Sequence, residues 1–300
     1  MTIKFAAIGI NHAHIYGQVD CLKRAGASFV AFHAVEDDLA KTFGDKYPEA
    51  RRVADPREIL EDASIQVVTT AAIPADRADI CLAAMRAGKD VLTDKPGMTT
   101  FAQLEEIKRV QKETGRIFSV CCPERFIVPS TIVAGKLIAD GAIGRVVQTI
   151  GLGPHRFNRA IRPDWFFDKR HYGGILTDIA SHQIDQFLHF TGSREAQIVA
   201  SGVGHFGGPE FPEFEDFGEI LLRSDRAGGY VRVDWFTADG LPTWGDGRLT
   251  ILGTEGTIEL RKYVDIAGRP GTDHLFLVDK SGTRHVDAAQ EPLSYFRDLI

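Results

Sequence analysis

The sequence has no apolar run long enough to cross a bilayer, only a small excess of acidic over basic residues and few cysteines. A membrane-spanning helix needs about 18 or more consecutive apolar residues, and no stretch here approaches that length. The net charge of −6, with both signs interspersed, argues against non-specific nucleic-acid binding. The first residues, Met1-Thr2-Ile3-Lys4, enter a predicted strand at once, so we predict no secretory signal. We therefore expect a cytoplasmic protein with a small-molecule partner and with no membrane or nucleic-acid partner.

The four cysteines are badly placed for disulfide bonds. Cys121 and Cys122 are chain neighbours, which rarely bridge, and no Cys-x-x-Cys pair occurs. We interpret them, together with Cys21 and Cys81, as buried free thiols of a reducing compartment.

A chain of 300 residues with 44% hydrophobic and 25% charged residues is typical of a globular protein of two domains. In the first part of the chain, short apolar runs alternate with stretches of helical spacing. Strands are predicted over residues 5–8, 29–33, 65–70, 91–93 and 117–120, and helices over 14–25, 37–46, 56–60, 75–87 and 101–114. This alternation predicts a doubly wound parallel sheet, which binds ligands at the carboxyl ends of its strands.

The loop after the first strand has part of a dinucleotide fingerprint. Gly9 stands at the first glycine position of Gly-x-Gly-x-x-Gly, but Asn11 and His14 occupy the other two. Asn11 tolerates left-handed backbone angles, although its side chain would crowd a diphosphate, and His14 is bulky for a close helix–strand approach. A plain strand–helix turn that binds nothing therefore stays open. Glu36, just after the second strand, is either the acid that binds a ribose or a solvated acid at a helix start.

Lys95 lies between Asp94 and Pro96 at the end of a predicted buried strand. Proline restricts the preceding residue to an extended backbone, so Lys95 should project from the strand end instead of entering a helix. Most lysines at strand ends are surface residues, but the Asp-Lys-Pro context favours a residue of the ligand site.

A predicted helix over residues 173–190 places Asp178, His182, Asp185 and His189 along one face. Three interpretations of such a stripe stay open: a set of metal ligands, a solvated helix face, and a pair of groups for acid–base catalysis. A carboxylate beside His182 would raise the pKa of the imidazole and orient it, which suits proton transfer near neutral pH.

The segment 155–166 is rich in donors and rings, including Arg156, Asn158 and Trp165. Rings that cover C–H faces beside groups that bind hydroxyls are typical of a sugar or polyol site, whereas an ordinary surface loop is the alternative. In the second half of the chain, strands without intervening helices predict an antiparallel sheet, with strands over 146–150, 218–222, 229–236, 248–252, 256–261 and 274–279 and loops over 204–212 and 267–272.

At these residues the chain resembles the Gfo/Idh/MocA oxidoreductase family. The resemblance lies in Ala87–Pro96, in Arg125-Phe126, in Gly141–Val146 and above all in Gly173-Gly174-x-Leu176-x-Asp178-x-x-x-His182-x-x-Asp185. It implies a Rossmann domain over residues 1–121 and an α/β domain with a large, mostly antiparallel sheet over 122–300. The second domain would bind substrate and pair protomers into a homodimer or homotetramer.

The resemblance also assigns roles to residues. Lys95, Asp178 and His182 fall on the family's catalytic positions, and Lys95-Pro96 falls where a cis peptide is often found. The departures are the degraded glycine loop, Asp94 for the usual glutamate, Ala34 at the usual acidic ribose position, and Arg77 near an often-found histidine. The family normally continues beyond a segment like Tyr295–Asp298, so a C-terminal helix is expected to be missing here.

We therefore expect an NAD(P)-dependent dehydrogenase that moves a hydride between the nicotinamide and a carbinol of a sugar, polyol or related small molecule. No metal is expected, and NAD and NADP stay open. The candidate cofactor residues are Gly9, Asn11, His12, Glu36, Asp94, Lys95 and Pro96, and the candidate substrate residues are Arg125, Arg156, Asn158 and Trp165. The alternatives are a non-catalytic dinucleotide sensor, and a metal-assisted lyase or hydrolase that uses the stripe from Asp178 to His189.

Overall fold

The structure is a computed structural model that describes residues 2–293 and 295–299. The chain divides into two compact units. The first contains the residues up to Cys121 together with Arg170–Gly173 and the end of the chain, and the second contains Cys122–Lys169 and Gly174–Leu293.

The first unit is built on a six-stranded sheet in the order β3-β2-β1-β4-β5-β6, and all of its strand pairs are parallel. Its strands are β1 (Lys4–Ile8), β2 (Ser28–His33), β3 (Arg51–Arg52), β4 (Val67–Thr70), β5 (Asp90–Asp94) and β6 (Phe118–Cys121). The strand order reverses between β1 and β4, which is where doubly wound sheets bind dinucleotides. The predicted Rossmann sheet is confirmed.

The main helices of the first unit are α1 (His14–Arg24), α2 (Asp37–Lys46), α4 (Arg77–Arg86) and α5 (Phe101–Thr114), with the short elements α3 (Arg57–Leu60), η1 (Pro74–Asp76), α8 (Lys169–Tyr172) and α11 (Tyr295–Leu299) at its edges. Helix α5 begins where the Thr100 side chain accepts a hydrogen bond from the Gln103 amide and the Gln103 side chain accepts from the Thr100 amide. It ends at Gly115, which adopts φ of 68°.

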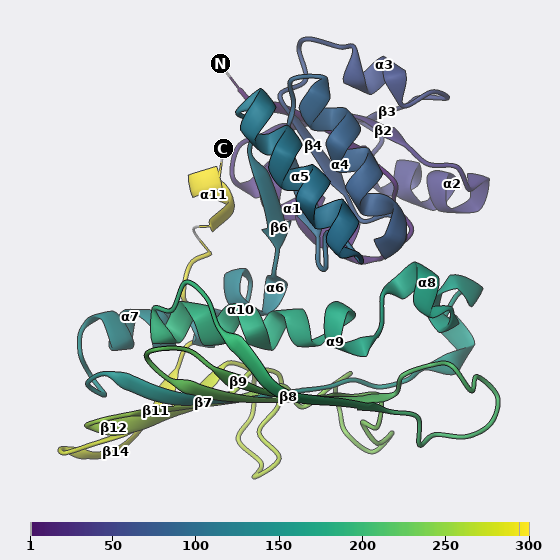
Figure 1. The fold of residues 1–300 in the computed structure, drawn as a ribbon. Helices are drawn as coiled ribbons and strands as arrows, with labels where there is room; N and C mark the ends of the chain where they lie inside the picture. Colours follow the sequence, from purple (N-terminus) through teal and green to yellow (C-terminus); the bar gives the residue numbers. More distant parts are fainter. Residues whose placement is uncertain (1, 294, 300) are drawn as a thin grey trace. The chain divides into compact units, whose positions relative to one another are not determined.

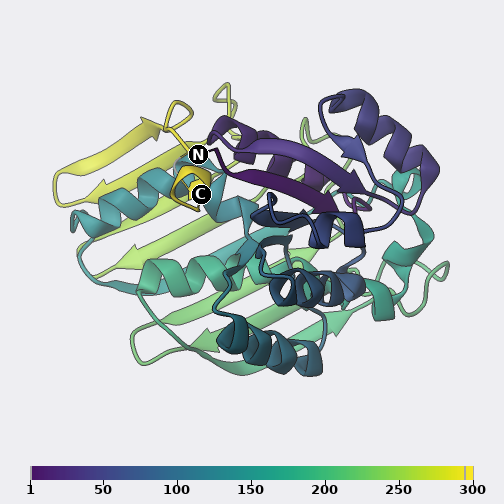
Figure 2. The same cartoon turned by 90° about the horizontal axis from the view of Figure 1, so that it is seen from above.

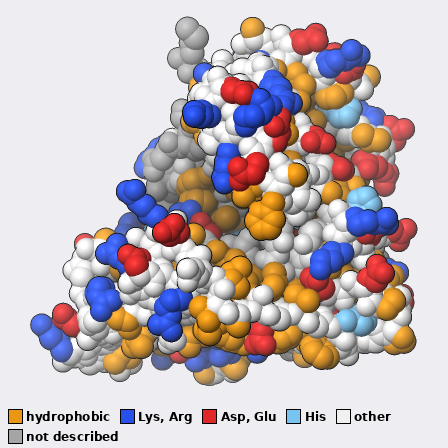
Figure 3. All heavy atoms as spheres, viewed as in Figure 1, with side chains coloured by type: hydrophobic (Ala, Val, Ile, Leu, Met, Phe, Trp, Pro, Cys, Tyr) orange, Lys and Arg blue, Asp and Glu red, His pale blue; other side chains and the backbone are white. Residues whose placement is uncertain are grey.

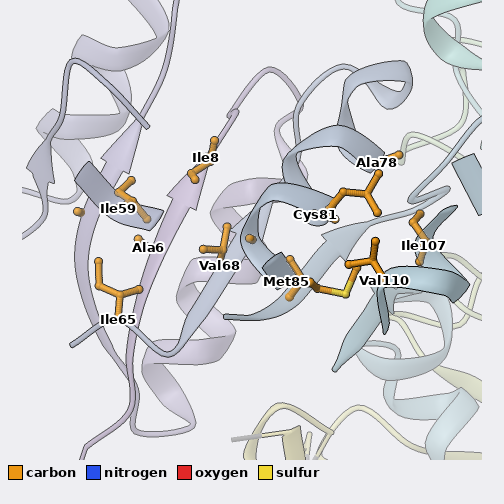
Figure 4. Packing of buried hydrophobic residues seen from close by; sticks show 14 of the residues in the cluster. Ala6, Ile8, Ile59, Ile65, Val68, Ala78, Cys81, Met85, Ile107 and Val110 are labelled. Carbon is orange, nitrogen blue, oxygen red and sulfur yellow. The ribbon is translucent and has the colours of Figure 1, made fainter. Parts of the chain in front are cut away.

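One core cluster of this unit lies between the sheet and helices α4 and α5 (Figures 1 and 4). Val68 and Val91 of the sheet and Cys81, Met85 and Val110 of the helices are all at most 1% exposed. In a parallel sheet, helices cover both faces. All four residues of β4 are therefore buried.

The second unit is built on an eight-stranded sheet in the order β14-β13-β12-β11-β7-β10-β9-β8, in which only β7 and β10 pair in parallel. Its strands are β7 (Val146–Pro154), β8 (Gln197–Gly204), β9 (Phe217–Arg223), β10 (Gly228–Asp234), β11 (Arg248–Gly253), β12 (Gly256–Arg261), β13 (His274–Asp279) and β14 (Gly282–Asp287). The predicted, mostly antiparallel sheet is confirmed. Strands β8 and β14 were not predicted, because both are edge strands with mostly exposed residues and lack an alternating apolar pattern.

The helices α6 (Pro123–Phe126), α7 (Pro129–Ala139), α9 (Ile175–Asp178) and α10 (Ala180–Thr191) belong to the second unit, with the 3₁₀ turns η2 (Arg159–Ile161) and η3 (Asp164–Phe167). Figures 1 and 2 show α7 and α10 along one face of the sheet. Helix α10 approaches β7 closely, because a Cβ atom added at Gly151 or Gly153 would lie 2.8 Å from the Gln183 side chain. Glycine at these two positions therefore sets the height of α10 above the sheet.

The prediction of one unbroken helix over residues 173–190 is wrong. The chain forms the single turn α9 and then α10, with Ile179 between them. The turn begins where the Ile175 amide donates to Glu215 at 2.9 Å and Gly174 adopts φ of 90°. Glu215 is distant in sequence, so helical spacing alone could not locate this start.

No helix within residues 2–293 or 295–299 is both long enough and apolar enough to cross a membrane. On the face seen in Figure 3, basic and acidic side chains are interspersed over each unit and are not gathered by sign.

Candidate active site

The loop after β1 is held between the carboxyl ends of β2 and β4. The Gly9 amide donates to His33 at 3.1 Å, and the His12 amide donates to Ala71 at 2.8 Å. Gly9 has φ of 77°, and an added Cβ would lie 2.5 Å from the Cβ of Ala72. Glycine is therefore required here for both backbone conformation and space.

The two bulky residues that replace the later glycines are hydrogen-bonded to neighbouring strand ends. Asn11 Nδ2 donates to Glu36 Oε1 at 2.8 Å, beyond the end of β2. His14 Nδ1 lies 3.0 and 3.2 Å from the two carboxylate oxygens of Asp94, at the end of β5. Both side chains are thus tied to carboxylates, while the loop still leads into the N-terminus of α1, an anion-binding feature of dinucleotide folds. These residues fit a dinucleotide despite the altered fingerprint.

Asp94 is the centre of a buried charge cluster. The residue is 0% exposed, and Arg77 Nη2 lies 3.1 Å from its carboxylate. Burial by itself would raise the pKa of Asp94, but the charges of His14 and Arg77 outweigh burial and hold that pKa well below its ordinary value. Asp94 is therefore ionised throughout the physiological range.

Arg77 connects this cluster to the lysine. Its Nε donates to the Ala72 carbonyl at 2.7 Å, and its Nη1 donates to the Lys95 carbonyl. Lys95 is 4% exposed, and its peptide bond to Pro96 is cis. The sequence showed Arg77 only as a departure from a histidine, whereas the structure shows a buried cation that fixes the backbone at Lys95.

His12 lies beside His14, with ring centroids 4.1 Å apart. Its Nδ1 accepts a hydrogen bond from the His14 amide at 3.2 Å. Burial and the neighbouring His14 lower the pKa of His12 well below the usual value. His12 is therefore a neutral imidazole near pH 7.

In the second unit, Asp178 ends α9 and His182 lies in the first turn of α10. His182 is 3% exposed. Burial lowers the pKa of Arg162, and the charge of Asp178 opposes that shift, which places this guanidinium within electrostatic reach of Asp178. Arg162 also lies over the rings of Phe166 and Trp235.

A buried ionic network lies beside His182. Lys262 Nζ is 2.6 Å from Glu124 Oε2 and donates to Gln186 Oε1 at 2.7 Å, and Gln186 Nε2 donates to the His182 carbonyl at 2.9 Å. Burial would raise the pKa of Glu124, but the charges of Lys262 and His182 bring it down to about 2. Sequence reasoning missed Glu124 and Lys262, because lysine and glutamate are rarely buried and these two are far apart in the chain.

The four candidate substrate residues all belong to the second unit. Arg125 forms a two-pronged pair with Asp185, with contacts of 2.5 and 2.9 Å. Arg156 donates to the carbonyls of Ala238 and Leu241, which anchors that loop. Asn158 adopts φ of 46°, and Trp165 is half-buried against Phe166. The two arginines therefore have structural partners, which their sequence context does not indicate.

The stripe from Asp178 to His189 does not gather as a metal site. Asp185 is paired with Arg125, and burial lowers the pKa of His189. In the part of the chain that the structure describes, one group of three histidine, cysteine or carboxylate side chains has its potential ligand atoms within 4.8 Å of one another. It consists of His12, His14 and Asp94. Arg77 already compensates the charge of Asp94 in that group.

Comparison with known proteins gives two family matches. Residues 3–121 match the oxidoreductase family with an NAD-binding Rossmann fold, and residues 132–259 match the GFO/IDH/MocA C-terminal domain. The chain is 26% identical over 256 residues to scyllo-inositol 2-dehydrogenase (NAD(+)) of Bacillus subtilis strain 168, covering 82% of this chain and 70% of that protein. It is 27% identical over 265 residues to inositol 2-dehydrogenase of Acidothermus cellulolyticus, covering 88% and 72%.

Solved structures of similar fold include two oxidoreductases. A protein of Erwinia carotovora atroseptica SCRI1043, assigned as an oxidoreductase, is 47% identical and superposes with a TM-score of 0.96, over 99% of this chain and 90% of that one. Levoglucosan dehydrogenase in complex with NADH and levoglucosan shares the fold, with a TM-score of 0.81 at 23% identity over 96% of this chain and 80% of that one.

Proposed function

The chain belongs to the Gfo/Idh/MocA oxidoreductase family, and from this premise we propose that it oxidises a carbinol of a sugar, polyol or related small molecule with NAD or NADP. The observation that carries the proposal is Lys95, which is buried at the carboxyl end of β5 with its backbone held by Arg77. Dinucleotide folds bind their ligand at this edge of the sheet.

In this mechanism three side chains act on one hydroxyl. His182 accepts the hydroxyl proton, Asp178 orients His182 and stabilises its charged form, and Lys95 donates a hydrogen bond to the same oxygen. Lys95 comes from the first unit and the other two from the second, so their meeting at one oxygen is part of the proposal. When bound, the nicotinamide ring supplies the acceptor for the hydride.

The cofactor contacts are proposed to come from the loop after β1 and from the carboxyl ends of β2 and β5. Gly9 makes the turn, and Asn11 and Glu36, which are hydrogen-bonded to each other beyond the end of β2, are proposed to bind the adenosine ribose. His12, Asp94, Lys95 and Pro96 lie toward β5. For the substrate, Asn158 and Trp165 offer an amide and a ring, which suits a hydroxylated molecule with apolar C–H faces.

The test measures nicotinamide reduction with a panel of inositols, pentoses and hexoses, using NAD and NADP separately. Lys95→Ala and His182→Ala should each lose most of the turnover, about 100-fold or more, because each removes a group that stabilises the transition state. Both variants should still bind NADH. Turnover that is unchanged in both variants, or a wild-type protein that reduces neither cofactor with any panel member, would contradict the proposal.

We also propose a cytoplasmic homodimer or homotetramer. Its support is the exposed side chains of Leu221, Leu252 and Val278, which alternate with buried residues on β9, β11 and β13 and therefore lie on the sheet face away from the core. Light scattering after gel filtration measures the mass, and a monomer at micromolar concentration would contradict the assembly.

A further inference from the structure

His14 and Asp94 form a hydrogen-bonded pair with a defined direction. Asp94 is fully buried and is ionised beside Arg77, so its carboxylate accepts hydrogen bonds and cannot donate them. His14 Nδ1 lies 3.0 Å from one of its oxygens. The hydrogen of this contact is therefore on Nδ1 of His14, and Nε2 is the ring nitrogen that remains for another partner.

His12 has the opposite arrangement. Its Nδ1 accepts from the His14 amide, so the ring hydrogen of neutral His12 is on Nε2. The side chain of His12 is 26% exposed and that of His14 is 38% exposed. Both imidazoles are therefore partly accessible to a ligand.

The topology separates this pair from the Asn11–Glu36 pair. Strand β2 lies on one side of β1, whereas β4 and then β5 lie on the other. Asn11 reaches Glu36 on the β2 side, and His14 reaches Asp94 on the β5 side. Dinucleotides bind across the point where the strand order reverses, with one half on each side.

We propose that the His14–Asp94 pair binds the nicotinamide-ribose half of the dinucleotide, with His14 Nε2 hydrogen-bonded to a hydroxyl of that ribose. This inference rests on the proposed function, because it assumes a dinucleotide. His14 is the contact residue, and Asp94 is the positioning residue that orients its ring. A metal held by His12, His14 and Asp94 is the rival, and the guanidinium of Arg77 at 3.1 Å from Asp94 opposes it, since a cation would have to bind beside an existing one.

Two probes separate the halves of the ligand, because ADP-ribose carries the second ribose and ADP lacks it. His14→Asn keeps an N–H donor toward Asp94 but removes the outward nitrogen. It should weaken ADP-ribose and NADH about 5- to 10-fold, the effect of one lost hydrogen bond, and leave ADP unchanged in calorimetric titrations. Glu36→Gln is the matched variant on the β2 side, and it should weaken ADP and ADP-ribose alike.

A second measurement does not depend on ligand or turnover. Nitrogen-15 NMR of the unliganded protein should show His14 with its hydrogen on Nδ1 and His12 with its hydrogen on Nε2. In Asp94→Asn, the new amide can donate to His14 and shift its hydrogen to Nε2, whereas Asp94→Glu should restore the wild-type tautomer and ADP-ribose affinity.

Three results would overturn the inference: equal loss of ADP and ADP-ribose in His14→Asn, no loss of either, or stoichiometric zinc in the purified protein. A protein that binds ADP-ribose as described but oxidises no polyol would contradict the proposed dehydrogenase activity and would still support this binding site.

Discussion

Replacing Lys262 by methionine should destabilise the second unit strongly, because it leaves a carboxylate buried without its partner. Lys262 and Glu124 have side chains that are 1% and 5% exposed, with 2.6 Å between Nζ and Oε2. Removing one member of such a pair costs about 3–5 kcal/mol. The same pairing holds the pKa of Glu124 at about 2 against an ordinary 4.5, because the charges of Lys262 and His182 outweigh burial.

The sign of the pH dependence follows from that shift. The folded pKa of Glu124 is below its unfolded value, so its stabilisation is present above pH 4.5 and is lost as the pH falls toward about 2. In Lys262→Met, burial acts without its largest opposing charge, so the pKa of Glu124 rises above the ordinary value. The variant therefore gains relative stability on acidification, and its deficit should narrow from about pH 7 to about pH 5.

Urea unfolding followed by tryptophan fluorescence measures this directly, because Trp165, Trp235 and Trp244 all belong to the second unit. Lys136→Met is the matched control, since Lys136 is 61% exposed where it pairs with Glu291 and should contribute less than about 1 kcal/mol.

Lys262→Met/Glu124→Gln should recover part of the loss, because it removes the stranded charge. A deficit that stays constant between the two pH values would show that the lysine acts through packing, and the electrostatic reasoning would be refuted.

Further predictions concern the first unit. Gly9→Ala should abolish NADH binding in a fluorescence titration, because its Cβ would lie 2.5 Å from that of Ala72, whereas Gly17→Ala, with open space around it, should bind normally. Thr100→Ala should lower the stability of the first unit by about 1 kcal/mol by removing the cap of α5, and unchanged hydrogen exchange in that helix would contradict this. Burial raises the pKa of Cys81 to about 12, so this thiol should resist an aromatic disulfide reagent at about pH 8 until urea unfolds the chain, and rapid native-state labelling would count against the burial.

The order of the elements could be predicted from the sequence, because periodicity and glycine positions are local signals. The strand before Lys95 follows from a short apolar run, and the strands from β9 to β13 follow from apolar alternation. Only part of the candidate site could be predicted from the sequence. The sequence indicated only that His14 is bulky for the glycine loop. Its carboxylate partner Asp94 could not be recognised, because it is 80 residues away in the chain.

The same limit applies to the second unit. Spacing placed Asp178 and His182 on one continuous helix, but the capping carboxylate of Glu215 starts a separate turn before α10. The buried pair Glu124 and Lys262 could not be predicted, since neither residue type indicates burial and 138 residues separate them. Long-range polar contacts, in contrast to periodicity, leave no local pattern in a sequence.

The central claim is that Lys95 and His182 act on the same oxygen, and a double-mutant cycle on kcat/KM tests it most directly. Residues that act as a unit on one transition state have non-additive effects. Lys95→Ala/His182→Ala should therefore be about as slow as the slower single variant. Losses that multiply, at unchanged NADH affinity, would show that the two residues act independently and would contradict the account.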